Sequence, residues 1–382
     1  MLYEPSESQA LVQETARSYA QTTLARVAGQ LDREARFPVA QLKELAELGL
    51  MGVNVPEELG GAQAGAVAYA LAMMEISQGC ASTGVTMAVN NMVAETIVKF
   101  GTPAQARRYV PEITSGRFEA ASFGLSEPHC GSDATALRST ARRDANGWVL
   151  NGSKQWITSG DHAGVIIVWA RTAVAADVSA AKGISCFLVE AGTPGLGIGR
   201  HEDKMGLRAS STVGLSFEDL RLPEDAMLGA PGQGFAIAMS ALEGGRVGIA
   251  AQAIGIGAAA LQAAVRYARD RKAFGKPIAE HQALRFMLAD VDTGLAAARL
   301  LVLRAAALKE AGLPFVREGS MAKVFATEKA NFACDVAVQV HGGYGYIDEF
   351  PVERHYRDAR VTTIYEGTSE IQRVVIARDV LR

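Results

Sequence analysis

Cysteine is scarce in this 382-residue chain: four cysteines stand far apart, and no two of them form a Cys-x-x-Cys pair. This spacing argues against a disulfide framework and against the usual zinc motifs, and it fits a reducing compartment. The six histidines form no His-Glu-x-x-His or His-x-x-x-His pair. We therefore expect no metal site.

An excess of either charge is also missing, since 38 Lys and Arg face 41 Asp and Glu, for a net charge of −3. A nucleic-acid-binding or lipid-binding surface needs a basic patch, which this balance does not favour. We found no apolar run of the roughly eighteen residues that a membrane span requires. The first residues, Met1 to Pro5, lack the basic and apolar regions of a signal peptide and are not an Arg-rich transit peptide. We expect a cytoplasmic protein that binds neither nucleic acid nor membrane.

The chain is 49% hydrophobic, and its residue patterns change along the sequence from helical to β-type and back to helical. These features predict an α+β, mostly α fold. Helical periodicity dominates residues 1–118, where Ser6-Glu7-Ser8-Gln9 reads as a capping box. Residues 119–226 are rich in β-formers, and an Asn-Gly turn precedes Trp148. Long Ala-rich helical runs fill residues 227–382. We predict an N-terminal helical domain, a middle antiparallel β-barrel or sandwich, and a C-terminal helical bundle.

A dinucleotide-type pattern occurs once, at Gly255-Ile256-Gly257-Ala258-Ala259-Ala260. The G-x-G-x-x-G/A motif binds a pyrophosphate only where a strand turns into a helix. Here it lies inside a long helical stretch, for which close helix packing is the better explanation. We expect no Rossmann domain.

The strongest candidate for chemistry is the segment Ile364 to Arg373, with sequence IYEGTSEIQR. It places the Glu366 carboxylate directly before a glycine and a hydroxyl, between apolar neighbours that would raise its proton affinity. A glutamate beside a glycine is a solvated turn in roughly nine cases of ten. On its own, the segment is therefore only a candidate for a general base.

Four further segments strengthen that candidate: Phe123 to Asp133, Asn151 to Gly160, Arg271 to Gly275, and Gln339 to Gly345. Together with the Glu366 turn, they resemble the signatures of the acyl-CoA dehydrogenase family, and the resemblance extends over essentially the whole chain. The family more often has two small residues where His129 and Cys130 stand here.

The resemblance implies FAD as the cofactor. The residues that would bind it are Phe123, Leu125, Ser126, Gly131, Ser132, Trp156, Ile157, Thr158, Arg271, Phe274, Gln282, Gln339, Val340, His341, Gly342, Gly343, Thr368, Ser369 and Glu370. In the family, the segments around Arg271 and Gln339 contact the flavin of a neighbouring subunit. A homotetramer built as a dimer of dimers is therefore implied as well.

The catalytic base implied by the resemblance is Glu366, because the relatives that carry their base just before the arginine of the long helix have a glutamate where Gly245 stands here. We expect Glu243-Gly244-Gly245-Arg246 to open that helix. The residues that would line the substrate channel are Ser132, Glu243, Arg246, Tyr365 and Gly367.

The function implied is oxidation of an acyl-CoA thioester to trans-2-enoyl-CoA, a step of fatty-acid β-oxidation, with electrons passing to an electron-transfer flavoprotein. Gly245 and the stretch Lys204 to Arg208 look most like the short-chain group. Two classes of alternative remain: an acyl-CoA oxidase or flavin monooxygenase on the same fold, and a non-catalytic flavin-bound scaffold. The acidic balance and the intact Glu366 argue against the scaffold.

Overall fold

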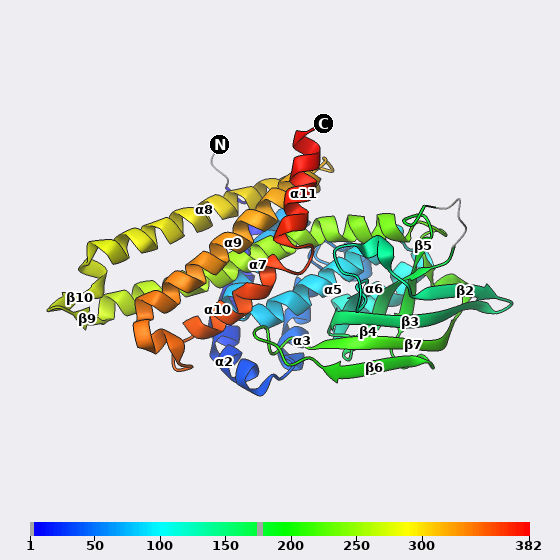
Figure 1. The fold of residues 1–382 in the computed structure, drawn as a ribbon, viewed down its shortest axis with the longest axis horizontal. Helices are drawn as coiled ribbons and strands as arrows, with labels where there is room; N and C mark the ends of the chain where they lie inside the picture. Colours follow the sequence, from blue (N-terminus) through cyan, green and yellow to red (C-terminus); the bar gives the residue numbers. More distant parts are fainter. Residues whose placement is uncertain (1–3, 174–178) are drawn as a thin grey trace.

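The computed structural model describes residues 4–173 and 179–382. Residues 1–3 of the N-terminal segment, on which the expectation about targeting partly rests, lie outside the described residues. A β-sheet region occupies one end of the elongated molecule (Figure 1), and long helices extend from it to the opposite end. The predicted fold class, mostly helical with a middle sheet region, is confirmed.

The N-terminal helices begin and end where local signals predict. Ser6 caps the first helix in a capping box with Gln9, and Gly49, with φ 73°, follows the helix that ends at Glu47. The helical elements of this region are α1 (Glu7–Tyr19), η1 (Ala20–Leu24), α2 (Ala25–Glu34), α3 (Val39–Glu47), η2 (Leu50–Gly52), η3 (Glu57–Leu59), α4 (Gly65–Gly79), α5 (Ala81–Phe100) and α6 (Pro103–Thr114).

The middle region forms one eight-stranded sheet in the order β6-β7-β3-β2-β4-β5-β8, with β1 paired to β4. The predicted antiparallel pairing holds along most of this order, whereas β1 and β2 lie parallel to β4. The last strand, β8, lies just beyond residue 226. The elements are β1 (Ala120–Gly124), η4 (Ala134–Ala136), β2 (Thr140–Asp144), β3 (Gly147–Thr158), β4 (Ala163–Arg171), β5 (Ile184–Glu190), β6 (Leu196–His201), β7 (Thr212–Leu222), η5 (Glu224–Ala226) and β8 (Met227–Leu228).

Strand β4 has no exposed face, which explains its unbroken apolar sequence. Val165, Ile167 and Trp169 pack in the cluster that also holds residues of α5 and α6. Ile166 and Val168 point the other way, into a cluster shared with β3, β5 and β7. The Trp169 indole N–H donates to the Gly234 carbonyl at 2.7 Å, which ties the sheet to the first long C-terminal helix.

The C-terminal region is a helical bundle joined to a small hairpin. Its elements are α7 (Gly234–Asp270), β9 (Lys272–Ala273), β10 (Lys276–Pro277), η6 (Ile278–Glu280), α8 (Gln282–Glu310), α9 (Val316–His341), η7 (Gly342–Tyr346), α10 (Val352–Arg360), η8 (Val361–Thr363) and α11 (Ser369–Val380). Because α7 begins at Gly234, the expectation that Glu243 opens it is wrong: Glu243 to Arg246 lie in the helix interior.

The glycine pattern of α7 serves helix packing, as predicted. A Cβ on Gly255 would lie 2.3 Å from the Met74 carbonyl oxygen, and one on Gly257 would lie 2.8 Å from Leu295. Helix α7 is also long and apolar enough to cross a membrane by length and composition, which corrects our reading of the apolar runs. However, 83% of its apolar window is buried within this structure, as in a core helix.

Candidate active site

Glu366 lies in a tight turn between η8 and α11. Its φ is 55° and that of Gly367 is 89°, so two consecutive residues adopt the left-handed region. That conformation costs a non-glycine residue about 1–2 kcal/mol, and such strain gathers at functional sites. The turn ends at Thr368, whose side chain caps α11 by accepting from the Ile371 N–H.

The Glu366 carboxyl is largely buried from solvent. Part of the residue remains accessible, but its Oε2 is buried and has no hydrogen-bond partner among the described residues. Burial raises the pKa of Glu366 to about 7, although Lys323 and Arg246 act in the opposite direction. A carboxylate with this proton affinity suits proton abstraction near neutral pH.

Helix α7 lies against this carboxyl at Gly245. A Cβ on Gly245 would lie 2.4 Å from Glu366 Oε2 and 3.2 Å from the Met92 sulfur. The glycine therefore makes room for the Glu366 side chain.

Two side chains that the sequence analysis did not single out donate hydrogen bonds to the backbone carbonyls of the Glu366 turn. Lys323, on α9, donates to the Gly367 carbonyl at 2.8 Å. Gln372, on α11, donates to the same oxygen at 2.9 Å and to the Glu366 carbonyl at 3.3 Å. Both residues are fully buried. The sequence signal for Lys323 is a single lysine between the apolar residues Met321-Ala322 and Val324-Phe325.

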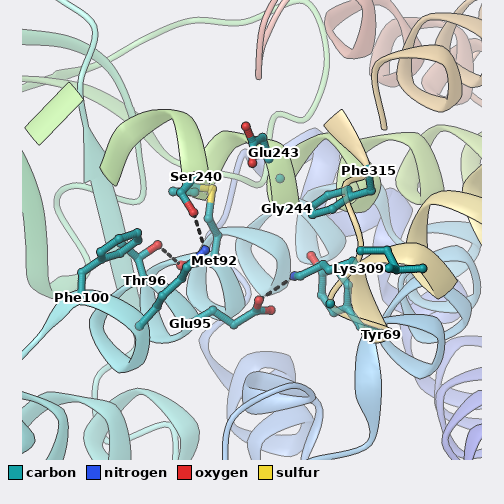
Figure 2. A pocket seen from close by; sticks show the side chains of 15 residues that line it. Tyr69, Met92, Glu95, Thr96, Phe100, Ser240, Glu243, Gly244, Lys309 and Phe315 are labelled. Atoms are coloured by element: carbon teal, nitrogen blue, oxygen red, sulfur yellow. Dashed lines mark hydrogen bonds and ion pairs between the residues drawn. The ribbon is translucent and has the colours of Figure 1, made fainter. Parts of the chain in front are cut away.

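A cavity of about 320 Å³ lies among α4, α5, α7 and α8 (Figure 2), and Gly245 is one of its lining residues. Lys309 pairs with Glu95 at 2.6 Å, and Lys99 donates to Ser240 at 2.8 Å. The lining residues are Tyr69, Met92, Glu95, Thr96, Lys99, Phe100, Ser240, Ala241, Glu243, Gly244, Gly245, Lys309, Gly312, Leu313 and Phe315. Gly245 thus belongs to the cavity and also lies against the Glu366 carboxyl, so the cavity is next to the candidate base.

Of the predicted substrate residues, Glu243 lines this cavity and the others lie outside its lining. Arg246 is buried beside it, with Nη1 3.5 Å from the Ser320 hydroxyl. The Tyr365 hydroxyl donates to Gln252, which is itself fully buried. Gly367 lies in the turn itself. Ser132 is exposed in the loop after β1, among the predicted flavin residues.

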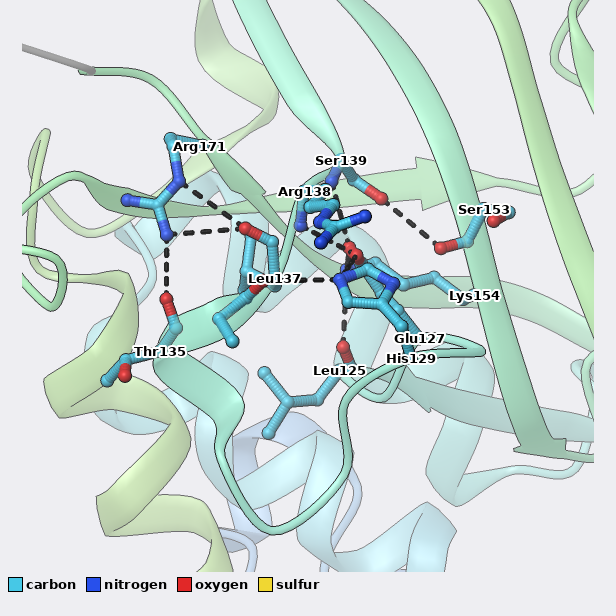
Figure 3. A network of polar contacts seen from close by, with 11 residues as sticks. Leu125, Glu127, His129, Thr135, Leu137, Arg138, Ser139, Ser153, Lys154 and Arg171 are labelled. Carbon is cyan, nitrogen blue, oxygen red and sulfur yellow. Dashed lines mark hydrogen bonds and ion pairs between the residues drawn. The ribbon is translucent and has the colours of Figure 1, made fainter.

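A buried ion pair joins the first two flavin-type segments (Figure 3). Glu127 accepts from Lys154 at 2.8 Å, and from the N–H groups of Arg138 and Ser139 at 2.6 and 3.0 Å. Lys154 also donates to the Leu125 carbonyl at 3.2 Å. Burial alone would raise the pKa of Glu127, but Lys154 and these hydrogen bonds outweigh it and lower that pKa. The pair therefore fixes the loop of Leu125 and Ser126 against β3.

The same loop brings three metal-type ligand atoms together, from Glu127, His129 and Cys130, within 4.8 Å of one another. The Glu127 oxygens already accept from Lys154 and from two backbone N–H groups. Burial raises the pKa of the Cys130 thiol, which disfavours the thiolate that a metal needs. The expectation that no metal binds stays a prediction.

The end of β3 offers a surface that fits a planar cofactor. The Trp156 side chain is 62% exposed, and its φ is 64°. The neighbouring Ile157 is buried, and the Thr158 carbonyl accepts from the Ser122 hydroxyl. Phe123, at the end of β1, packs its ring 4.2 Å from that of Trp169. A Cβ on Gly131 would meet nothing within 4 Å, so the loop backbone there is open to a ligand.

The second group of predicted cofactor residues gathers at the β9–β10 hairpin and the end of α9. The Arg271 guanidinium lies 5.8 Å from the centre of the Tyr344 ring, and His341 stacks on Tyr267 at 4.2 Å. Phe274 is 96% exposed. A Cβ on Gly342 or Gly343 would meet nothing within 4 Å. Gln339 and Val340 end α9, and Gln282 begins α8.

These two groups lie far apart in one chain. The hairpin lies at one extremity of the molecule's longest axis, and β3 belongs to the sheet near the other (Figure 1). Thr368, Ser369 and Glu370 form a third group, at the start of α11. The Ser369 hydroxyl there is buried without a hydrogen-bond partner among the described residues.

Three family models match the chain in succession. The acyl-CoA dehydrogenase N-terminal domain matches residues 6–117, the middle domain 122–220 and the C-terminal domain 232–381. A relative named short-chain specific acyl-CoA dehydrogenase, mitochondrial, from Bos taurus is 52% identical over 381 residues, which are 99% of this chain and 91% of the relative.

Solved structures are similar over the same extent. Butyryl-CoA dehydrogenase from Megasphaera elsdenii superposes with a TM-score of 0.97 at 38% identity, with all of both chains covered. Glutaryl-CoA dehydrogenase from Mycobacterium smegmatis in complex with FADH2 superposes with a TM-score of 0.92 at 30% identity. That match covers 98% of this chain and 95% of the other.

Proposed function

This chain belongs to the acyl-CoA dehydrogenase family, and from that premise we propose that it oxidises an acyl-CoA thioester to trans-2-enoyl-CoA with Glu366 as the catalytic base. The observation that carries the proposal is the Glu366 carboxyl, whose buried Oε2 has no hydrogen-bond partner among the described residues and whose pKa is raised to about 7, next to a cavity. Gly245 supplies no side chain where α7 lies against this carboxyl, so no carboxylate stands at that position.

The chemistry requires removal of a weakly acidic proton next to a thioester carbonyl. The Glu366 carboxylate would take the α-proton and become a neutral carboxylic acid. The Glu366 backbone N–H would donate to the thioester oxygen and stabilise the enolate-like charge that develops. When bound, FAD supplies the acceptor for the β-hydrogen, which leaves as hydride.

The FAD would lie over the end of β3. Trp156 would flank the ring system, and Thr158 would donate a hydrogen bond to it. The backbone around Ser126 and Gly131 would hold the polar edge of the ring and the pyrophosphate. The exposed aromatic side chain and the open backbone at Gly131 support this placement. A related chain in this fold binds FADH2.

We propose a short acyl chain as the substrate, as in fatty-acid β-oxidation. The proposal is supported by the names of two similar proteins, a short-chain acyl-CoA dehydrogenase and a butyryl-CoA dehydrogenase. We further propose a homotetramer that passes its electrons to an electron-transfer flavoprotein. The separation of the two cofactor-type groups along one chain supports the oligomer. A cytoplasmic location remains a proposal from the sequence.

The experiment is an anaerobic titration of the purified flavoprotein with acyl-CoA thioesters of graded length, followed by bleaching of the flavin absorbance. We expect complete bleaching at one equivalent of a short thioester and weaker bleaching as the chain grows. If the protein binds FAD but none of the thioesters bleaches the flavin absorbance, it would be the non-catalytic scaffold instead.

A further inference from the structure

Lys323 is a buried cation with no carboxylate within ion-pair distance among the described residues. Its side chain is fully buried on α9, and no ion pair within 4 Å involves it in residues 4–173 and 179–382. Removing an ammonium group from water costs several kcal/mol unless the protein compensates it. The compensation here is a hydrogen bond of 2.8 Å to the Gly367 carbonyl, and the nearby Glu366 carboxyl raises the lysine's pKa against burial.

The carbonyl that Lys323 holds belongs to the strained part of the Glu366 turn. Gly367 has a φ of 89°, and a Cβ there would lie 2.7 Å from the Gln372 amide nitrogen. Lys323 and Gln372 therefore converge on one oxygen. Because the left-handed conformation of Glu366 is unfavourable for a non-glycine residue, such a turn persists only when its surroundings restrain it.

The charges that face Glu366 come from several elements. Lys323 on α9 and Arg246 on α7 are the cations that lower the carboxyl's pKa. Tyr69 on α4 and Tyr365 in the turn present hydroxyls whose pKa values burial raises, so both stay neutral. Burial lowers the pKa of Lys323 to about 8, and Glu366 has its own raised to about 7. At neutral pH Lys323 is thus an ammonium, and its charge favours the carboxylate form of Glu366.

We propose that Lys323 is a positioning residue for the catalytic base, because its ammonium restrains the Glu366 turn through the Gly367 carbonyl. The charge of that ammonium also favours the carboxylate form of Glu366. The inference rests on the proposed function, because it assigns Lys323 a role in that same proton transfer. Lys323 gives up no proton in the reaction. The α-proton passes to Glu366, and the ammonium stays charged and hydrogen-bonded to Gly367.

The test compares Lys323→Met, Lys323→Gln and Lys323→Arg with the wild-type flavoprotein. The rate of anaerobic flavin reduction by the best thioester is measured from pH 5.5 to 9.5, together with FAD content and KM. We expect the Met and Gln variants to retain FAD and to shift the acidic limb of the profile upward by about one pH unit, because a favourable charge is lost. We expect a plateau rate reduced about tenfold and a smaller change in KM.

Three controls separate this role from a general effect on stability. Lys323→Arg keeps the charge and should keep the acidic limb near its wild-type position. Lys329→Met, on the same helix and packed on Phe325 and Phe332, should leave the profile unchanged. In a Glu366→Gln background, Lys323→Met should change the residual rate by less than about twofold, since residues that act through one another are not additive.

The outcomes are distinct. If none of the tested thioesters reduces the flavin of the wild-type protein, the proposed function fails. If the wild type is active and either neutral variant keeps the wild-type acidic limb, the role of Lys323 is overturned while the function stands. An equal shift in Lys323→Arg, or loss of FAD from both neutral variants, would assign the lysine to the fold rather than to the base.

Discussion

A methyl group on Gly245 would lie 2.4 Å from the Oε2 atom of Glu366, although the two residues are 121 positions apart in the chain. Real Cβ atoms essentially never approach another heavy atom so closely. The carboxyl thus occupies the volume that any side chain at position 245 would need. This contact places the candidate base against α7, next to the cavity.

Gly245→Ala should therefore impair catalysis. A glycine in a helix interior costs about 1 kcal/mol relative to alanine, so the fold should tolerate the change or gain from it. The displaced carboxyl should lower kcat/KM about 10- to 100-fold, since a shift of about 1 Å has that effect on a positioned group. Gly29→Ala in α2 is the matched control, because it lies outside the cavity and its Cβ would meet the flexible end of Arg354 at 3.1 Å. Equal losses in the two variants would contradict the steric argument.

Glu366→Gln should keep FAD and lose at least about 10³-fold in kcat, because the amide cannot accept the α-proton. Flavin reduction in single-turnover experiments measures this directly. Glu328→Gln, a change at an exposed glutamate on α9, is the control for substitution of a carboxylate. Near wild-type flavin reduction in Glu366→Gln would remove Glu366 from the base's role.

The pH dependence of the wild type should report the same carboxyl. With a pKa of about 7 in the free protein, Glu366 is protonated below that pH, so kcat/KM should fall about tenfold per pH unit below 7 and level off above it. Initial rates of flavin reduction across buffers of constant ionic strength test the slope. A profile that stays flat down to pH 5 would mean that the base titrates elsewhere.

Glu366 should also reduce the stability of the folded protein at alkaline pH. Burial raises its pKa from 4.5 to about 7, so the folded state favours the protonated form, and stability is lost as pH rises through 7. The cost above that pH is on the order of 3 kcal/mol. Glu366→Gln, which stays neutral, should therefore raise Tm more at pH 8 than at pH 5. An equal change in Tm at both pH values would show that the carboxyl is not desolvated.

Arg271→Ala should weaken cofactor binding and assembly together. A guanidinium is a strong partner for a pyrophosphate, and a ligand shared between chains stabilises the assembled state. Light scattering and flavin absorbance, measured on one sample, give mass and FAD content for the variant and the wild type. A monomeric wild type with full FAD content would contradict the shared-cofactor arrangement.

Much of the fold could be read from local patterns, because helix caps, periodicity and turn residues act over a few positions. Ser6 and Gln9 formed the predicted capping box, and the glycines Gly255 and Gly257 lie at close helix contacts as expected. The paired glycines at 244 and 245 predict the opening of a helix, whereas α7 begins at Gly234. They lie in the helix interior, where the missing side chains leave room for Lys309 and Glu366.

The sequence by itself determined the family, the order of helical and sheet regions and the identity of the candidate base, because each depends on short motifs whose residues are neighbours in the chain. Only the tertiary structure decided what surrounds that base. Lys323, Gln372 and Gly245 meet the Glu366 turn from three different helices. A pKa depends on the burial and charge that such distant segments create together, and no local pattern of residues specifies either.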